Sequence, residues 1–263
     1  IMERLQEARL SFQLVKAIAT GDPRNEVWGE NFPREFESYR STLDTSFRSR
    51  YAGSSRRDYL GEDPNLVILW AGYAFSREYE QARGHYYAIE DIQTTLRTGV
   101  AQPATCWTCK STDVPRLMAE TGPAEFYKGS WDSLGSQVVN NIGCQDCHDP
   151  QTMNLRVTRP ALVEAMQRQG VDIRKATLQE MRSYVCGQCH VEYYFAGEGK
   201  NLTFPWNNGL KVEEIEKYYD DVGHKDWVHA ETGAPVLKAQ HPEFEMWNQG
   251  IHARSKVACA DCH

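Results

Sequence analysis

The chain has 263 residues, of which 41% are hydrophobic and 25% are charged, and its formal net charge is −7. These values are ordinary for a globular protein of one large or two modest domains. The negative charge argues against nucleic acid as a partner. No apolar run approaches the roughly 18 residues of a membrane-spanning helix.

Helices separated by long loops are expected in the first part of the chain. Apolar residues at three- and four-residue spacing predict a helix over residues 2–19, which residues 21–23 (Gly-Asp-Pro) would end. Residues 24–63 are polar and rich in Arg, Ser and aromatic side chains, and are expected to be irregular. The apolar run 67–74 is consistent with a buried strand or a buried helical segment, and residues 86–97 predict a further helix.

The rest of the chain predicts three more helices and one insertion. The helices are expected over residues 159–169, 177–185 and 212–219, and residues 196–210 are a turn-rich insertion. No sustained alternation of apolar and polar residues predicts a large sheet. The expected fold class is therefore mainly α, with extensive loops and little β.

Four pairs of cysteines account for all 8 cysteines of the chain. Three pairs have the pattern Cys-x-x-Cys-His, and the first pair is followed by a lysine. In this pattern two thiols form thioethers to the vinyl groups of haem c, and the following residue is placed to ligate iron. The motifs are Cys106-Trp-Thr-Cys109-Lys110, Cys144-Gln-Asp-Cys147-His148, Cys186-Gly-Gln-Cys189-His190 and Cys259-Ala-Asp-Cys262-His263.

A zinc-binding scaffold is the alternative for paired cysteines. Zinc ribbons place their two cysteine pairs roughly 15–20 residues apart, whereas the gap from Cys109 to Cys144 is wider. Zinc also gives no reason for a His or Lys after each second cysteine. We therefore expect covalent haem c, whose faces replace part of the apolar core. Because haem c is attached outside the cytoplasm, we expect a periplasmic protein whose export signal has been removed.

Lys110 makes one haem chemically different from the others. An amine must lose its proton before it binds iron, at a free-energy cost that the metal offsets. A simple electron carrier gains nothing from this cost, so we expect Lys110 to be the proximal ligand of a haem whose distal side is open to substrate. The alternative, a surface lysine beside an ordinary haem, would leave that iron without a proximal ligand.

Histidines outside the motifs are candidates for the second axial position of the other haems. We expect His85 and His252 to be distal ligands, with a hydrogen-bonded core or surface histidine as the alternative. His224 and His229 lie in a polar loop and are not expected to bind iron.

Several segments of the chain resemble cytochrome c nitrite reductase, the ammonia-forming pentahaem enzyme, and occur in the same order as in that family. The resemblance covers about residues 67–263 and thins out before residue 60. The family's fifth haem motif and long C-terminal helices are expected beyond His263. The matching segments are Leu96-Arg97-Thr98-Gly99, the lysine motif, Cys186 to Phe195, Leu237 to Pro242 and Gly250-Ile251-His252.

The resemblance implies a periplasmic six-electron reduction of nitrite to ammonium. It implies that Lys110 ligates the active-site haem, and that Arg97, Tyr193 and His241 line its distal pocket. A guanidinium suits the nitrite anion, while His241 and Tyr193 can supply or relay protons. A single iron cannot provide six electrons by itself, so it needs neighbouring redox centres. The other haems would supply these electrons.

The resemblance also implies a calcium site beside the pocket. Glu192 and Gln240 would give side-chain oxygens, and Tyr193 and Lys238 backbone carbonyls, a ligand set that suits a hard cation. Because Glu192 adjoins Tyr193 and Gln240 adjoins His241, calcium would hold both pocket residues in place. The alternative is an ordinary ion pair between Glu192 and Lys238.

The implied partners are nitrite, a second copy in a homodimer and a multihaem electron donor. The donor would be a membrane-anchored quinol dehydrogenase subunit, through which the protein could associate with the membrane, or a soluble cytochrome. We expect one multihaem cytochrome c domain over residues 1–263, with a helical and loop segment, 1–100, that carries Arg97, and the four motifs in 101–263. A non-catalytic electron-transfer cytochrome and another lysine-haem reductase, acting on hydroxylamine or sulfite, remain as alternatives.

Overall fold

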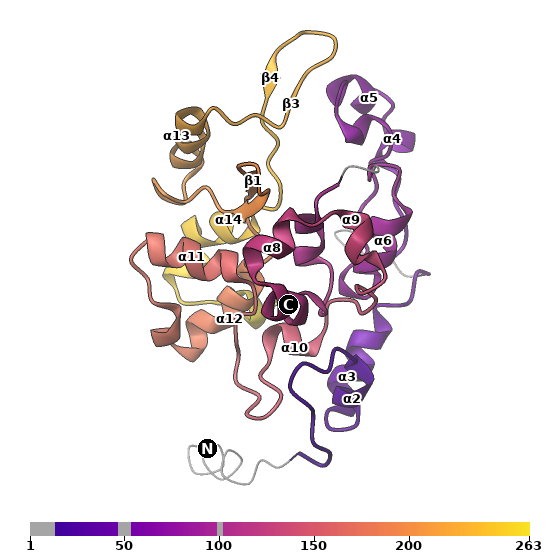
Figure 1. Ribbon diagram of the computed structural model, residues 1–263, viewed down its shortest axis with the longest axis vertical. Coiled ribbons are helices and arrows are strands. Elements are labelled where there is room, and N and C mark those ends of the chain that lie inside the picture. The colour runs from indigo at the N-terminus through magenta and orange to yellow at the C-terminus, as the bar shows by residue number, and fades with distance from the viewer. Residues whose placement is uncertain (1–13, 47–53, 99–101) are drawn as a thin grey trace.

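The computed structural model describes residues 14–46, 54–98 and 102–263. These residues form short helices joined by long loops, with two small two-stranded antiparallel sheets (Figure 1). The expected fold class, mainly α with extensive loops and little β, is confirmed. Within the described ranges, no helix is long and apolar enough to cross a membrane.

The N-terminal part is more helical than the sequence predicted. Residues 2–13 of the predicted first helix lie outside the described ranges, and residues 14–19 are not helical, so that prediction is wrong for the described part. The described part of residues 24–63, a range expected to be irregular, contains three helices. One of them begins at Pro33, whose fixed φ suits a first helical turn. The elements are α2 (Asn25–Gly29), α3 (Pro33–Ser41), α4 (Tyr59–Glu62), α5 (Leu66–Leu69), η1 (Ala74–Ser76), η2 (His85–Tyr87) and α6 (Ala88–Thr94).

The apolar run 67–74 is not a buried segment. It begins as helix α5, but Ile68 and Leu69 are 62% and 58% exposed. Burial here comes from two aromatic side chains, Trp70 and Tyr73, whose ring centroids lie 5.5 Å and 4.7 Å from that of Trp227. The helix predicted over residues 86–97 is present but shorter, as η2 followed by α6.

Three helices of the C-terminal half confirm the sequence predictions. Thr177 and Glu180 form a reciprocal capping box at the start of α12. Gly223 ends α13 with φ 66°, a left-handed conformation that glycine adopts without strain. The elements are η3 (Ala104–Cys109), α7 (Val114–Thr121), α8 (Pro123–Lys128), α9 (Trp131–Gly135), α10 (Cys144–Cys147), α11 (Pro160–Arg168), η4 (Ile173–Lys175), α12 (Leu178–Gly187), α13 (Val212–Val222), α14 (Glu243–Gln249), α15 (Ile251–Arg254) and η5 (Cys259–Asp261).

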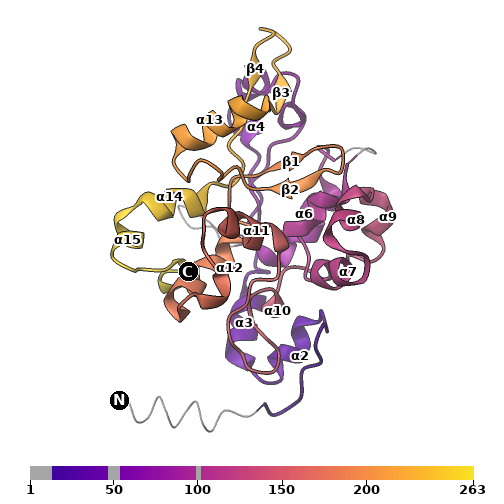
Figure 2. The same cartoon turned by 60° about the vertical axis from the view of Figure 1, so that its left-hand side comes forward.

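The two β-hairpins lie close to Tyr193 and His241 in the sequence. Strand β1 (Tyr194–Ala196) begins directly after Tyr193 and pairs with β2 (Asn201–Thr203), in the register Tyr194↔Thr203. The insertion predicted over 196–210 therefore contains a strand as well as turns. Strands β3 (Trp227–Val228) and β4 (Pro235–Val236) pair in the same way, and β4 leads toward His241. Figure 2 shows β1 and β2 below β3 and β4.

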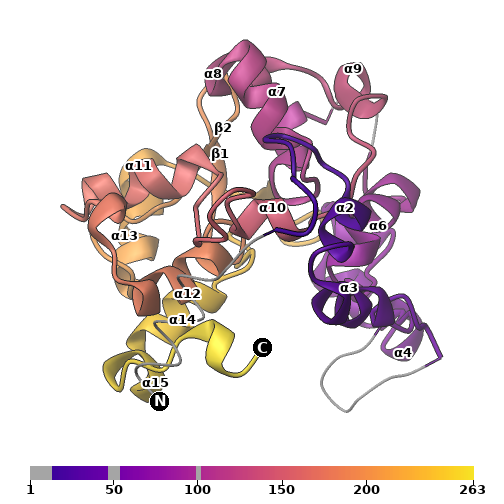
Figure 3. The same cartoon turned by 90° about the horizontal axis from the view of Figure 1, so that it is seen from below.

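Buried tryptophans fix the first cysteine motif in the core. Trp107, which lies between the two cysteines of that motif, is fully buried and stacks on Trp131 with ring centroids 3.4 Å apart. Trp206 stacks on Phe244 in the same core. Seen from below, helices α11 to α15 lie on one side and α2 to α6 on the other, with α10 between them (Figure 3).

Candidate active site

Each cysteine pair lies on or at the end of a short helical segment. A helical turn brings residues three apart onto one face, so both thiols of a motif can reach one haem edge. In the second motif the His148 N–H donates to the carbonyl of Cys144, and the other two histidine motifs repeat this four-residue turn. The Lys110 N–H donates instead to the carbonyl of Trp107, three residues back. The lysine motif is therefore wound more tightly than the histidine motifs.

The third motif lies next to the other three. Its Cys189 thiol is a hydrogen-bond partner of Cys109 in the lysine motif. Its Cys186 thiol partners Cys259 of the fourth motif and is close enough to Cys147 of the second for their charges to interact. Haems attached at these positions would be neighbours, with the third at the junction.

Two of the motif histidines, His148 and His190, have surroundings that are compatible with metal ligation. His148 Nδ1 lies 3.1 Å from the carbonyl oxygen of Met153, which can only accept, so that nitrogen carries the proton and Nε2 is free for a metal. The His190 ring centroid lies 6.2 Å from that of His85. This spacing leaves room for one metal between two imidazoles, since each metal–nitrogen bond is about 2 Å.

The remaining histidine predictions concern His252, expected to be a distal ligand, and His224 and His229, not expected to bind iron. His252 has an exposed side chain on α15 and is not in ring contact with a motif histidine among the described residues. His224 lies between Tyr194 and Tyr219, and His229 Nε2 lies 2.9 Å from the carbonyl of Ile68. The contacts are those of packed or hydrogen-bonded side chains, and that neither His224 nor His229 binds iron stays a prediction.

The cysteines do not gather as zinc ligands do. In the described part of the chain, no three His, Cys, Asp or Glu side chains converge as a metal-binding group. Burial raises the pKa of Cys106 to about 11 and that of Cys147 to about 12, so both thiols are uncharged in their apolar surroundings. Thioether bonds to haem carry no charge and suit this setting. The donor set thus fits covalent haem.

A cavity joins the lysine motif to two of the predicted distal residues. Lys110, Tyr193 and His241 all line it, together with the cysteines of the first motif. Burial raises the pKa of the Tyr193 hydroxyl, so this group keeps its proton. The remaining lining residues are Thr105, Cys189, Phe195 and Leu202.

Arg97 lies beside this cavity rather than in its lining. Its Nε donates to the Thr95 hydroxyl over 3.0 Å, and its guanidinium carbon lies 4.7 Å from the centre of the Phe75 ring. Its charge acts on Tyr73, which is also influenced by Cys106 and hydrogen-bonded to Gln240. Arg97 therefore supplies positive charge next to the cavity.

Glu243 links the cavity to the third motif. Its carboxylate lies 3.7 Å from His241 Nδ1 and 4.0 Å from His190 Nδ1. Burial is the largest single influence on Glu243 and opposes its ionisation, but its hydrogen bonds with His241 and the backbone and the charges of His241 and His190 together lower the pKa of Glu243. One carboxylate thus orients both a cavity side chain and an iron-ligand candidate.

The predicted calcium residues form an oxygen cluster behind the cavity. Glu192 is buried, and its carboxylate accepts from the Tyr219 hydroxyl over 2.8 Å and from the Gln240 N–H over 2.6 Å. Lys238 Nζ donates to Gln240 Oε1 over 2.7 Å rather than to Glu192. Asp226 accepts from the Gln240 side chain over 3.1 Å.

Sequence reasoning missed Asp226 as a member of this cluster. Its carboxylate also accepts from the Lys238 N–H over 2.6 Å. The only signal in the sequence was an acidic residue in the polar loop before β3. Its spacing from Glu192 and Gln240 follows no known motif. One oxygen of the cluster, Gln240 Oε1, already accepts from a cation, the ammonium of Lys238, whose pKa is lowered by burial. Oxygens arranged in this way suit a hard cation.

The fold and these motifs define a multihaem c-type cytochrome. The chain belongs to the cytochrome c552 family, whose model matches residues 24–263. The similarity to this family therefore begins earlier in the chain than the sequence motifs indicated.

Curated relatives share this similarity. A cytochrome c-552 of Porphyromonas gingivalis (strain ATCC BAA-308 / W83) is 58% identical over 254 residues, covering 94% of this chain and 51% of the relative. A cytochrome c-552 of Parabacteroides distasonis is 55% identical over 271 residues, covering 100% of this chain and 55% of the relative. The chain thus spans about half the length of the curated relatives it matches.

A solved structure shares the fold. It is the cytochrome c nitrite reductase from Desulfovibrio desulfuricans ATCC 27774, with a TM-score of 0.87 and 33% identity. The match covers 94% of this chain and 59% of that one, and the catalytic subunit of that enzyme has two calcium sites.

Proposed function

We propose that this protein reduces nitrite to ammonium at a haem carried by Cys106 and Cys109, with Lys110 as the proximal ligand. The observation that carries the proposal is the cavity in which Lys110, Tyr193 and His241 meet beside those cysteines. Haem bound there supplies a redox-active iron for the N–O bonds of nitrite. The similarity to a cytochrome c nitrite reductase supports the same reaction.

The side chains around the cavity have complementary tasks. Arg97 attracts the nitrite anion, because its guanidinium adds positive charge at the edge of the cavity. His241 delivers protons, and Glu243 beside its Nδ1 holds the imidazole in orientation. Tyr193 keeps its proton and donates a hydrogen bond to a substrate oxygen. Conversion of nitrite to ammonium and two waters takes six electrons and eight protons, so repeated proton delivery is essential.

The remaining motifs would supply electrons. We assign His190 and His85 as the axial pair of the third haem, on the basis of the 6.2 Å between their rings. His148 and His263 are the proximal ligands of the second and fourth haems, and His252 remains a candidate distal ligand. Because the third motif touches the lysine motif through Cys189 and Cys109, electrons would enter the active site through the third haem.

We propose calcium as the brace of the cavity. Glu192, Gln240 and Asp226 offer side-chain oxygens, and Tyr193 and Lys238 offer carbonyls. Calcium would replace the ammonium of Lys238 at Gln240 Oε1. It would then fix Tyr193 and the segment that ends at His241.

The setting follows from the proposed reaction. We propose a periplasmic protein, since haem c is completed outside the cytoplasm, acting as a homodimer. Its electron donor would be a multihaem cytochrome, either soluble or a membrane-anchored quinol dehydrogenase subunit.

The test measures ammonium and electrons together, with the pigmented full-length protein, nitrite and a reduced viologen dye. We expect one ammonium for every six electrons. Electron consumption without ammonium would favour a lysine-haem reductase for hydroxylamine or sulfite. No turnover, with only low-spin haems in the spectrum, would favour an electron-transfer cytochrome.

A further inference from the structure

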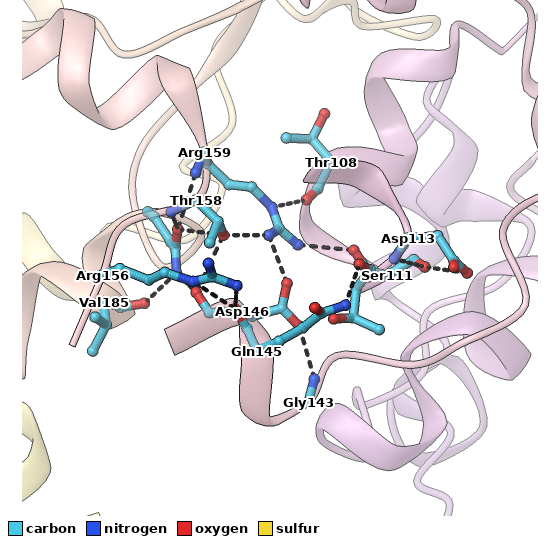
Figure 4. Close-up of polar contacts among 12 residues, drawn as sticks. Thr108, Ser111, Asp113, Gly143, Gln145, Asp146, Arg156, Thr158, Arg159 and Val185 are labelled. Carbon is cyan, nitrogen blue, oxygen red and sulfur yellow. Dashed lines mark hydrogen bonds and ion pairs between the residues drawn. The ribbon is translucent and has the colours of Figure 1, made fainter. Parts of the chain in front are cut away.

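Arg159 is a buried cation outside every cysteine motif. It directly precedes α11, at the N-cap position, and its side chain is 0% exposed. Figure 4 shows its guanidinium between the first and second motifs. Nε donates to the carbonyl of Thr108 and Nη2 to the carbonyl of Ser111, both over 2.8 Å. Nη1 donates to Asp146 Oδ1 and to the Thr158 hydroxyl, both over 2.6 Å.

The two carbonyls held by Arg159 stand on either side of Lys110. Thr108 is the second variable residue of the lysine motif, and Ser111 directly follows Lys110. A planar guanidinium presents its donors at fixed angles, so it sets the distance and orientation between its acceptors. The backbone that carries Lys110 is therefore held at both ends by one side chain.

The same cluster reaches the second and third motifs. Asp146 is the second variable residue of the second motif, and its other oxygen accepts from the Gly143 N–H over 2.8 Å. Gln188 has the same position in the third motif. Its amide donates to the carbonyl of Asp146 over 3.0 Å and accepts from the Arg159 N–H over 3.2 Å. Asp146 and Gln188 are each 2% exposed and Thr108 is 0% exposed.

Such a buried ion pair is a costly way to stabilise a fold. Removing two charges from water costs several kcal/mol per ion, and packed apolar side chains would often be at least as stable. What the pair offers instead is a defined geometry between distant segments. A lysine ligand needs this, because its side chain has four flexible carbons and no second ring nitrogen for a neighbour to hold.

We propose that Arg159 is a positioning residue for Lys110, which fixes the backbone on both sides of the ligand relative to the second and third motifs. The inference rests on the proposed role of Lys110 as an iron ligand. Arg159 touches neither substrate nor iron in this account. Its effect is on the geometry and the strength of the bond between Lys110 and the haem iron.

The test compares Arg159→Gln with Arg168→Gln in the full-length haem-loaded protein. Arg168 lies on the same helix but is exposed, and it also donates to a backbone carbonyl, that of Phe204, over 3.0 Å. We expect Arg159→Gln to change the electron paramagnetic resonance spectrum and the reduction potential of the lysine-type haem. We expect kcat for nitrite to fall about 10–100-fold with KM little changed. Arg168→Gln should change none of these.

Two further variants guard against a simple failure to fold. Arg159→Gln leaves Asp146 buried without its partner, whereas Asp146→Asn with Arg159→Gln leaves no unpaired charge. This double variant should show the same spectral change. Arg159→Lys keeps the charge without the planar donor set, and should not restore the wild-type spectrum.

An unchanged lysine-haem spectrum in Arg159→Gln and in the double variant would overturn the inference, even if activity fell. A wild-type spectrum in Arg159→Lys would also overturn it, because charge alone would then suffice. If the wild-type protein formed no ammonium but the spectrum still changed in Arg159→Gln, the proposed reaction would fail and the positioning role would stand.

Discussion

The lysine motif and the second motif solve the same problem in different ways. Under the proposed function, each must present one nitrogen to a haem iron at a fixed angle. His148 is a rigid ring whose Nδ1 is held by the carbonyl of Met153, so its other nitrogen is oriented directly. Lys110 has no second nitrogen, and the structure instead holds the carbonyls before and after it through Arg159.

This difference shows where each site is vulnerable. The histidine depends on a contact within its own loop, five residues away. The lysine depends on a buried side chain from a distant segment, which also holds the second and third motifs. A change at Arg159 should therefore act on the lysine-type haem, and a change at Met153 on the second haem.

The largest expected effect lies on the distal side of the lysine-type haem. His241→Asn removes the proposed proton donor from the cavity, so kcat for nitrite should fall about 10²–10⁴-fold. His229→Asn is the matched control, because His229 does not line the cavity and its Nε2 lies 2.9 Å from the carbonyl of Ile68. Steady-state kinetics of both variants decide the point. Equal losses would mean that the cavity is not the active site.

Lys110→His removes the chemical difference between the two motifs. We expect haem to remain attached, since both thioether cysteines are present, and kcat to fall about 10–100-fold. Intact-protein mass gives the haem content, and stopped-time ammonium assays give the rate. Unchanged turnover would show that a lysine at this position has no special role.

Calcium removal should act through the cavity rather than through the haems. We expect Glu192→Gln, or prolonged chelation, to lower kcat about tenfold, because Tyr193 and His241 lose their support. Added calcium should restore the chelated wild type but not Glu192→Gln. Glu213→Gln, on the exposed face of α13, is the control. Full activity after verified calcium loss would leave the cluster as an ordinary network around Lys238.

Met153→Pro should have the smallest effect on turnover, and its effect should be confined to the second haem. Met153 has φ 61°, which proline cannot adopt, so the carbonyl that holds His148 must move. The spectrum of the second haem should change, while that of the lysine-type haem stays as in the wild type. Met153→Gly tolerates this φ and should change neither. A change confined to the lysine-type haem would contradict the comparison.

The sequence predicted the parts of the site that are contiguous. A cysteine motif is read directly, because its chemistry lies within five residues. Helices α11, α12 and α13 were predicted because apolar periodicity is a local signal; Pro160 and the capping box of Thr177 are further local signals at the starts of α11 and α12. The helices in residues 24–63 were missed, because short polar helices carry little periodicity.

Residues that act through distant partners could not be predicted. The partners of Arg159 lie 51, 48 and 13 residues away in the sequence. Arg97 was predicted in the cavity lining, and its contact with Phe75 depends on how two loops meet. Asp226 joined the oxygen cluster for the same reason. Tertiary packing determines the contacts of Arg159, Arg97 and Asp226, and no short sequence pattern predicts them.

A crystal structure of the oxidised full-length protein soaked with nitrite tests the central claim most directly. We expect nitrite at the haem attached to Cys106 and Cys109, on the side where Tyr193 and His241 line the cavity. An iron with side chains on both faces, or nitrite bound at another haem, would contradict it.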